Sequence, residues 1–202
     1  MRPVLRVYRI RWSTNVERVA LALAHKGLEV EWIDVDPADR TPVREASGQE
    51  LVPVLEDGDL VLADSTRILH HLEGLRPDPP LFPRDPARAA EVEIFIDWFN
   101  RAWKREPNLI ADGAGDAEEV ARWGARMQRR LDLFEGLLSG RDYLFDTFGA
   151  ADCVAWPFLH YAVEIDPEDD EVFHHVLNER LDVSGHPAVT AWIDRVAQRP
   201  KA

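Results

Sequence analysis

The sequence predicts an α+β fold made of two modules, a mixed strand-and-helix module followed by an all-helical one. Strand-like runs alternate with a helical pattern as far as residue 76, five prolines crowd into 77–86, and the remainder is helical with almost no strand signal. Because proline lacks an amide donor, 77–86 should be an extended linker. The expected domains are therefore 1–76 and 87–202.

The composition excludes several classes of protein. With 24 Lys and Arg against 37 Asp and Glu, the formal net charge is −13, so the surface should repel phosphate backbones and anionic lipids. The single cysteine, Cys153, cannot form an internal disulfide or a multi-cysteine zinc site. No apolar run approaches the roughly 20 residues of a membrane-spanning helix. We therefore expect a cytoplasmic protein with no metal site and no nucleic-acid or membrane partner.

The first module begins with a strand, a helix and a second strand. Residues 4–10 alternate and are rich in β-branched side chains, and residues 29–35 have the pattern of another strand. Thr14 and Glu17 have the spacing of a capping box that starts a helix. Gly27 should end that helix in a left-handed conformation. So short a strand–helix–strand unit predicts two parallel strands joined by a right-handed crossover.

The rest of the chain continues with a hairpin and then helices. Residues 51–55 and 60–62 flank a turn sequence and predict the hairpin. A helix should follow over 63–73. The helices expected in the second module cover 87–106, 117–138, 150–164, 169–181 and 188–198.

Three short segments could bind a ligand, and each also has a purely structural interpretation. Ser13 precedes the first helix, where it could cap the helix or donate a hydrogen bond to a bound thiolate. Pro53 interrupts a strand-like run, either as an edge proline with a trans bond or as a cis proline that exposes the preceding backbone. Asp64 and Ser65 open a helix, where they could be caps or could bind an ammonium and a carboxylate group.

The helix expected over 87–106 carries two apolar stripes. One stripe contains Val92, Phe95, Ile96, Phe99 and Trp103, and the other contains Ile94, Trp98 and Ala102. Two stripes on one helix indicate two buried contacts, one with the core and one with a dimer partner or a ligand. A wholly structural role for these aromatic residues is the alternative.

Taken in order, these segments resemble the cytosolic glutathione transferases, which join a thioredoxin-like first domain to a helical second domain. The resemblance covers essentially the whole chain. Residues 13–23 are similar to the serine-type first helix of the tau, theta and zeta classes. Residues 52–55 are similar to the family's cis-proline segment, and 63–65 to its glutathione motif. Residues 148–152 and 186–192 are similar to the capping box and the final helix of the helical domain.

The resemblance implies a glutathione site in the first domain. Val52, before a cis bond to Pro53, would pair through its backbone with the cysteinyl part of glutathione. Ser65 would hold the γ-glutamyl carboxylate, and Asp64 would orient the ammonium group. Ser13 would donate a hydrogen bond to the sulfur and stabilise the thiolate.

The chain departs from the family pattern at two places. Gln49 and Glu50 stand where many serine-type relatives carry a basic residue for the glycyl carboxylate, so Arg40 or Arg44 is the expected substitute. Gly149 stands where Ser or Thr is usual in the helical capping box, a change that should cost only a few tenths of a kcal/mol.

The sulfur contact has two further candidates. Tyr8 lies near the end of the first strand, where tyrosine-type relatives carry their hydroxyl. Thr14 is adjacent to Ser13, although its expected capping role should direct its oxygen toward the helix amides.

The implied function is transfer of glutathione to a hydrophobic electrophile by a homodimer. The electrophile pocket should lie between the domains. Its candidate lining residues are Trp12, Phe95, Trp98, Trp103 and Trp156. The alternatives are a glutathione-dependent isomerase or dehalogenase, and a non-catalytic binding protein with the same fold.

Overall fold

The computed structural model describes residues 4–202 and divides the chain into two compact units. The first unit contains the residues up to Phe82 together with Arg199–Ala202, and the second contains Pro83–Gln198. The elements of the first unit are β1 (Leu5–Arg9), α1 (Thr14–Lys26), β2 (Val30–Asp34), α2 (Thr41–Ser47), β3 (Val54–Asp57), β4 (Leu60–Leu62) and α3 (Ser65–Leu75).

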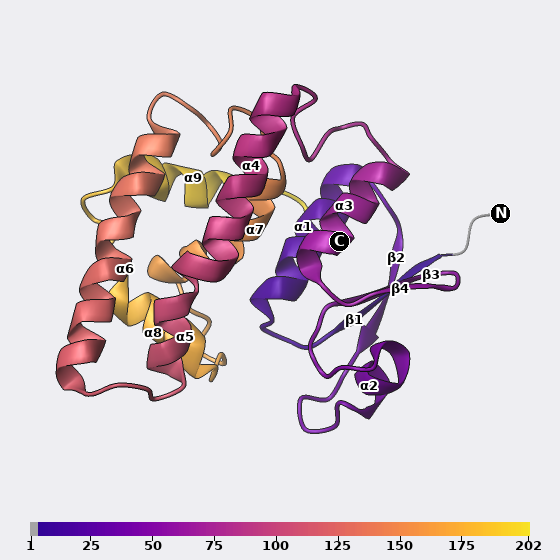
Figure 1. The fold of residues 1–202 in the computed structure, drawn as a ribbon, viewed down its shortest axis with the longest axis horizontal. Coiled ribbons are helices and arrows are strands. Elements are labelled where there is room, and N and C mark those ends of the chain that lie inside the picture. The colour runs from indigo at the N-terminus through magenta and orange to yellow at the C-terminus, as the bar shows by residue number, and fades with distance from the viewer. Residues whose placement is uncertain (1–3) are drawn as a thin grey trace. The chain divides into compact units, whose positions relative to one another are not determined.

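The first unit is built on a four-stranded mixed sheet in the order β2-β1-β3-β4 (Figure 1). β1 and β2 are parallel, as the strand–helix–strand pattern predicted, and β3 runs antiparallel to both β1 and β4. The end of β1, the start of β3 and the end of β4 therefore meet at one end of the sheet. We call it the Ile10 end, because Ile10, Val52 and Ala63 pack there against one small core.

The helices of the first unit cover the sheet in two groups. α1 and α3 pack side by side, whereas α2 lies on the other side of the sheet (Figure 1). α2 was not predicted from the sequence, although Pro42 in its first turn and the left-handed Gly48 at its end (φ 76°) are helix boundary signals. Val43 of α2 packs with Tyr8 and Val54 of the sheet.

A buried cation holds the proline-rich segment against the first unit. The Lys26 side chain is fully buried, pairs with the Glu73 carboxylate at 2.5 Å and donates to the Pro79 carbonyl at 2.6 Å. Glu73 also accepts a hydrogen bond from the Leu81 amide at 2.8 Å. These contacts fix the chain where it leaves the first unit.

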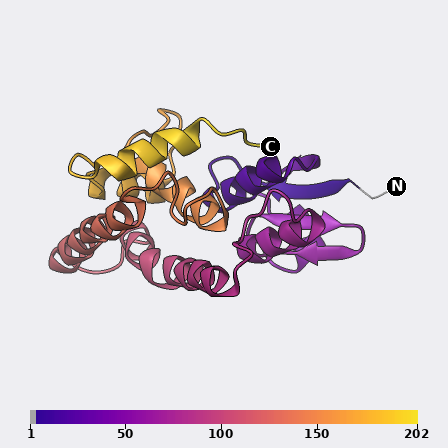
Figure 2. The same ribbon diagram turned by 90° about the horizontal axis from the view of Figure 1, so that it is seen from above.

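The last residues of the chain return to the first unit (Figure 2). The Ala202 amide donates to the Ala20 carbonyl of α1 at 3.2 Å, and Lys201 pairs with Glu17 of the same helix.

The second unit is helical. Its elements are α4 (Pro86–Trp98), η1 (Phe99–Trp103), α5 (Arg105–Ala111), α6 (Ala117–Leu138), α7 (Ala150–Leu159), η2 (His160–Ala162), α8 (Val172–Arg180) and α9 (Pro187–Ala197). Among residues 4–202, no helix combines the length and apolarity that a membrane crossing requires.

The helix predicted over 87–106 is interrupted by η1, a π-helical turn, and resumes as α5 as far as Ala111. Arg130 of α6 explains part of this geometry. Its Nη1 donates to the carbonyl groups of Ala102 and Trp103, at 2.9 and 3.3 Å, and pairs with the buried Glu106 at 2.6 Å. A change of helix period leaves some backbone carbonyl groups without their usual partner in the helix, and Arg130 donates hydrogen bonds to two carbonyl groups at this turn.

The start of α7 is organised by the buried Asp152. Its carboxylate accepts hydrogen bonds from the Leu144 amide at 3.1 Å, the Gly149 amide at 3.0 Å and the Trp192 indole at 2.8 Å. Of the two hydrogen bonds in the expected capping box, the one from the Gly149 amide to the Asp152 side chain is therefore present. Burial outweighs these hydrogen bonds and raises the pKa of Asp152 to about 6.

Candidate functional site

The topology brings together three of the segments singled out in the sequence. Ser13 follows the end of β1, Val52 precedes β3, and Ser65 follows β4, so all three stand at the Ile10 end of the sheet. Val52 and Ala63 pack against the same core as Ile10. Concave sites in mixed sheets commonly lie where strand ends and helix starts converge.

Ser13 is the N-cap of α1, which corrects the prediction that Thr14 and Glu17 form the capping box. The Ser13 hydroxyl accepts a hydrogen bond from the Val16 amide at 3.4 Å. The residue before it, Trp12, has a left-handed backbone (φ 68°), and the Ser13 amide donates to the Ile10 carbonyl at 3.2 Å. This tight turn sets the cap one residue earlier than the sequence suggested.

The capping role leaves the Ser13 proton available. A hydroxyl has one donor and two acceptor positions, and capping uses one acceptor position. Ser13 is half-buried at the start of α1, where the positive end of the helix dipole favours an anion. The side chain can therefore cap the helix and donate to a bound anion at the same time.

The Tyr8 side chain packs in the same small core as Ile10, but its hydroxyl is directed toward Glu56. Its hydroxyl donates to Glu56 at 3.0 Å, and Glu56 pairs in register with Arg6, nearer the start of β1. Tyr8 also belongs to the small core that contains Val43 of α2. Burial, reinforced by Glu56, raises the pKa of Tyr8. Its hydroxyl is thus engaged elsewhere and is a poor donor to a thiolate.

The loop before β3 is held by Gln49. Its side-chain amide donates to the Leu51 carbonyl at 2.6 Å and accepts from the Leu51 amide at 2.5 Å. The Val52–Pro53 peptide bond is cis, as the resemblance implied. Gln49, at a position where a basic residue was expected, therefore fixes the backbone next to Val52.

The start of α3 combines Asp64 and Ser65 with a residue that the sequence analysis missed. Asp64 is the N-cap and accepts a hydrogen bond from the Arg67 amide at 2.9 Å. Ser65, which is buried, accepts a hydrogen bond from Arg18 Nη1 at 3.4 Å. Arg18 lies on α1 and is 1% exposed. Arg18 does not share the helical spacing of Val16, Val19 and Leu23, so the periodicity of α1 did not indicate that it is buried.

Arg40 and Arg44 converge on Glu50. Arg40 Nη1 donates to the Glu50 carbonyl at 3.3 Å, and Arg44 donates to the Glu50 carboxylate from both Nε and Nη2. Both arginines therefore stand beside the loop that leads to Val52. Arg44 already carries an internal carboxylate partner.

The five candidate pocket residues differ in what they can offer a ligand. Trp12 is half-buried in the first unit, with the Arg11 guanidinium 4.3 Å from its ring centroid. Phe95 and Trp98 contact Phe134 in the second unit, and Trp98 is half-buried.

Trp103 and Trp156 are core residues. Trp103 is 0% exposed and stacks on Phe99 with ring centroids 4.5 Å apart. Trp156 is buried, and its indole donates to the Ile193 carbonyl at 2.9 Å. Direct contact between either ring and a ligand would require the core to rearrange.

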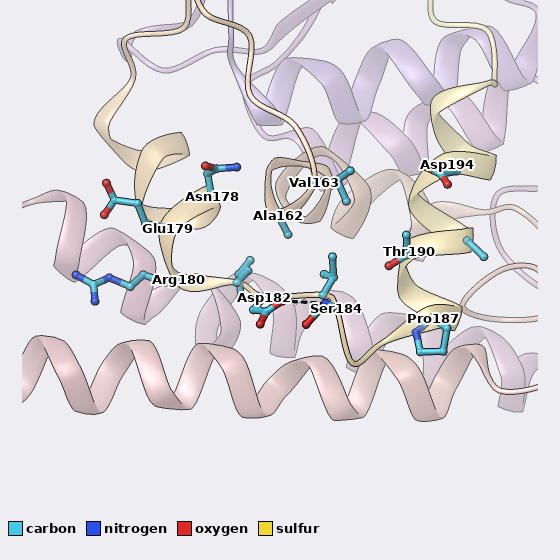
Figure 3. A pocket seen from close by; sticks show the side chains of 13 residues that line it. Ala162, Val163, Asn178, Glu179, Arg180, Asp182, Ser184, Pro187, Thr190 and Asp194 are labelled. Atoms are coloured by element: carbon cyan, nitrogen blue, oxygen red, sulfur yellow. Dashed lines mark hydrogen bonds between the residues drawn. The ribbon is translucent and has the colours of Figure 1, made fainter.

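A separate pocket of about 900 Å³ lies within the second unit, beside the loop between α8 and α9 (Figure 3). Exposed carboxylates of Glu179, Asp182 and Asp194 surround apolar side chains such as Val163, and the Ser184 amide donates to Asp182 at 2.9 Å. None of the residues predicted as site residues lines it. Within residues 4–202, no group of three or more His, Cys, Asp or Glu side chains is arranged to hold a metal ion.

Comparison with known proteins agrees with this geometry. The chain is 28% identical to pyrimidodiazepine synthase of Drosophila melanogaster over 98% of its own length and 78% of that protein. A tau class glutathione S-transferase from mango, Mangifera indica, superposes with a TM-score of 0.81 at 19% identity, over 98% of this chain and 90% of that one. A theta class enzyme from Xanthomonas axonopodis pv. citri, with glutathione bound, gives 0.75 at 23% identity, over 98% and 94%.

Both halves of the chain match domain families. Residues 7–80 match the glutathione S-transferase N-terminal domain, and residues 117–195 match the glutathione S-transferase C-terminal domain. The mixed sheet with its cis proline and the helical second unit are the thioredoxin-like and all-helical domains that the sequence predicted. The chain therefore belongs to the glutathione S-transferase family.

Proposed function

We propose that this chain is a glutathione transferase that joins the glutathione thiolate to a hydrophobic electrophile. The observation that carries the proposal is the Ser13 hydroxyl, which caps α1 at the Ile10 end and keeps its own proton for a ligand. A thiol with a pKa of about 8.5 needs such a donor to ionise at neutral pH.

The thiolate of the ligand is the nucleophile in this mechanism. The thiol proton leaves to solvent, the sulfur forms a bond to an electrophilic carbon, and a leaving group departs with its electron pair. Ser13 stabilises the sulfur anion and attacks nothing. The amides and dipole at the start of α1 add to that stabilisation because they are already oriented before the reaction.

The remaining residues of the Ile10 end hold glutathione in the proposed complex. Val52 pairs through its backbone with the cysteinyl part beside cis Pro53, Ser65 binds the γ-glutamyl carboxylate, and Asp64 orients the ammonium group. Arg40 and Arg44 both contact Glu50, in the loop before Val52. This position supports a role for the two arginines in binding the glycyl carboxylate.

The electrophile is proposed to contact the aromatic candidates that retain exposed surface. Trp12 and Trp98 are half-buried. Phe95, Trp103 and Trp156 would support the pocket from the core rather than touch the electrophile. A hydrophobic substrate follows from this aromatic composition.

One observation favours a second candidate, a non-catalytic binding protein. The pairing of Arg44 with Glu50 reduces the charge available for a glycyl carboxylate. A third candidate, a glutathione-dependent isomerase or dehalogenase, uses the same thiolate on a different electrophile. The similarity to pyrimidodiazepine synthase supports this third candidate, since the name of that relative does not describe a conjugation reaction.

We also propose that the chain acts as a cytoplasmic homodimer. The second stripe of α4 and η1 has Ile94 69% exposed, an apolar side chain that a partner could cover. Cys153 is buried and forms no disulfide, which suits a reducing compartment. Sedimentation analysis of the parent and of Ile94→Asp tests the dimer, which should dissociate in the variant.

Two measurements test the proposed function. Retention of the parent on immobilised glutathione is expected for every candidate that binds glutathione. Steady-state transfer of glutathione to a generic aryl halide then separates conjugation from passive binding. Ser13→Ala should keep the retention and lose most of the transfer at neutral pH. Retention without any transfer, or turnover of other electrophiles only, would favour the second or third candidate.

A further inference from the structure

α1 contains two buried cations whose surroundings differ. Lys26, near the end of the helix, pairs with the carboxylate of Glu73. Arg18, two turns earlier, directs Nη1 to the hydroxyl of Ser65 at 3.4 Å. Both residues are 1% exposed. The Lys26 pair secures the linker, whereas Arg18 contacts the first residue of α3 at the Ile10 end.

The contact with Arg18 determines how the Ser65 hydroxyl can be used. Its oxygen accepts from the guanidinium, so the hydroxyl proton must be directed elsewhere. A hydroxyl that accepts from a cation is polarised and becomes a better donor, an effect that is stronger in a low-dielectric environment. Ser65 is itself buried, at 6% exposed.

The charge of Arg18 reinforces this effect. A guanidinium stays protonated at any working pH, and burial weakens the screening of its field by water. It therefore places a permanent positive charge behind the hydroxyl, in addition to the positive end of the α3 dipole. All of these features favour an anion in front of Ser65.

We propose that Arg18 is a positioning residue for the γ-glutamyl carboxylate of glutathione. It acts through Ser65, orienting and polarising the hydroxyl and adding positive charge behind it, without touching the ligand. The inference rests on the proposed function, because it assumes that glutathione binds with its γ-glutamyl group at the start of α3.

The test compares two ligands on the same variants by calorimetry. The first ligand is glutathione, and the second is γ-aminobutyryl-cysteinyl-glycine, which lacks only the α-carboxylate of the glutamyl group. Arg18→Met removes the donor and the charge. Arg18→Lys keeps the charge and should fold if the first variant does not. Lys26→Met is the matched control, because it removes the other buried cation of the same helix.

Arg18→Met should weaken glutathione binding about tenfold, the loss expected for a charge-assisted contact, and leave the affinity for the analogue unchanged. Arg18→Lys should recover part of the loss. Adding Ser65→Ala to Arg18→Met should weaken binding less than the two single losses combined, since both act on one contact. Lys26→Met should lower the thermal stability and leave the ratio of the two affinities unaltered.

Two results would overturn the inference alone. One is equal weakening of both ligands by Arg18→Met and Arg18→Lys, which would mean that Arg18 only supports the fold. The other is unchanged glutathione affinity in both variants. A parent that binds neither ligand would instead contradict the proposed function, and this inference with it.

Discussion

Arg44 donates from both Nε and Nη2 to a single carboxylate oxygen of Glu50. The pair lies next to the loop that leads into β3, and both side chains are about half exposed. If Arg44 binds the glycyl carboxylate of glutathione, Glu50 is an internal competitor that the ligand must displace.

Glu50→Gln should therefore tighten glutathione binding. The substitution removes the competing charge and preserves the shape of the side chain. Exposed ion pairs contribute about 0–1 kcal/mol, so the expected gain in affinity is up to about fivefold. Calorimetry at low ionic strength is the suitable measurement, since salt screens exposed charges. Glu45→Gln is the control, because Glu45 is an exposed carboxylate on α2, the helix that carries Arg44. This variant should not change the affinity for glutathione. Weaker binding by Glu50→Gln would mean that Glu50 itself supports the site.

Ser13→Ala should raise the pKa of bound glutathione's thiol while leaving the peptide bound. Removing a donor to the charged form disfavours that form, so conjugation should fall most at neutral pH and recover partly as the pH rises. The measurement is the thiolate absorbance of the complex against pH. Tyr8→Phe should leave the titration unchanged, because the Tyr8 hydroxyl is engaged by Glu56.

Thr14→Val is the second comparison for the same titration. Thr14 is the first residue of α1, is not its cap and is only 8% exposed, so its hydroxyl is largely shielded from a bound ligand. We expect no shift in this variant. A shift in Tyr8→Phe together with none in Ser13→Ala would assign the protein to the tyrosine-type group.

Ser65→Ala should weaken glutathione binding more than Ser13→Ala does. A carboxylate at a helix start loses a charge-assisted bond worth about 1.5–3 kcal/mol, which corresponds to roughly tenfold to a hundredfold in affinity. Ser13 acts on the thiolate, which is a minor species of the free ligand at neutral pH, so its loss should change the affinity little. Equal affinity of Ser65→Ala and the parent in calorimetry would move the γ-glutamyl site elsewhere.

Local signals were sufficient to predict most of the fold. Gly27 ends α1 with φ 57°, Asp64 caps α3, and β1 pairs with β2 in parallel, because these outcomes depend on turn chemistry and on short-range topology. The first apolar stripe of the helix after the linker is buried along its whole length, from Val92 to Trp103.

The errors arose where tertiary contacts choose between equivalent local options. Ser13 and Thr14 are equally good caps by residue type, and the turn that ties Ser13 to Ile10 decides between them. At the π-helical turn η1, the carbonyl groups of Ala102 and Trp103 accept hydrogen bonds from Arg130, a residue on a different helix. Arg18 has the appearance of an ordinary helix cation until α3 is packed beside it.

The last prediction concerns the pH dependence of folding stability and Asp152. Burial raises its pKa to about 6 in the folded protein, against an ordinary value of 3.8. The folded state therefore binds more protons than the unfolded state between these values, and the free energy of unfolding falls as the pH rises through this window. The full effect is about 3 kcal/mol, of which about 1 kcal/mol should appear between pH 5 and pH 7.5.

Asp152→Asn isolates this contribution. The amide cannot ionise, so the stability of the parent relative to the variant should decline from pH 5 to pH 7.5, measured by chemical denaturation of both proteins at each pH. The variant should also be less stable by an amount that does not depend on pH. In the parent the Gly149 amide donates to the Asp152 carboxylate, and in the variant the NH2 group of the asparagine would face that amide. Asp182→Asn is the control: a hydrogen bond from the Ser184 amide lowers the pKa of Asp182 below its ordinary value of 3.8, so this carboxyl group is ionised in both the folded and the unfolded state from pH 5 to pH 7.5, and its parent–variant difference should stay constant. A parent–variant difference that is flat for Asp152→Asn would mean that the carboxyl group keeps the same charge in both states across this range.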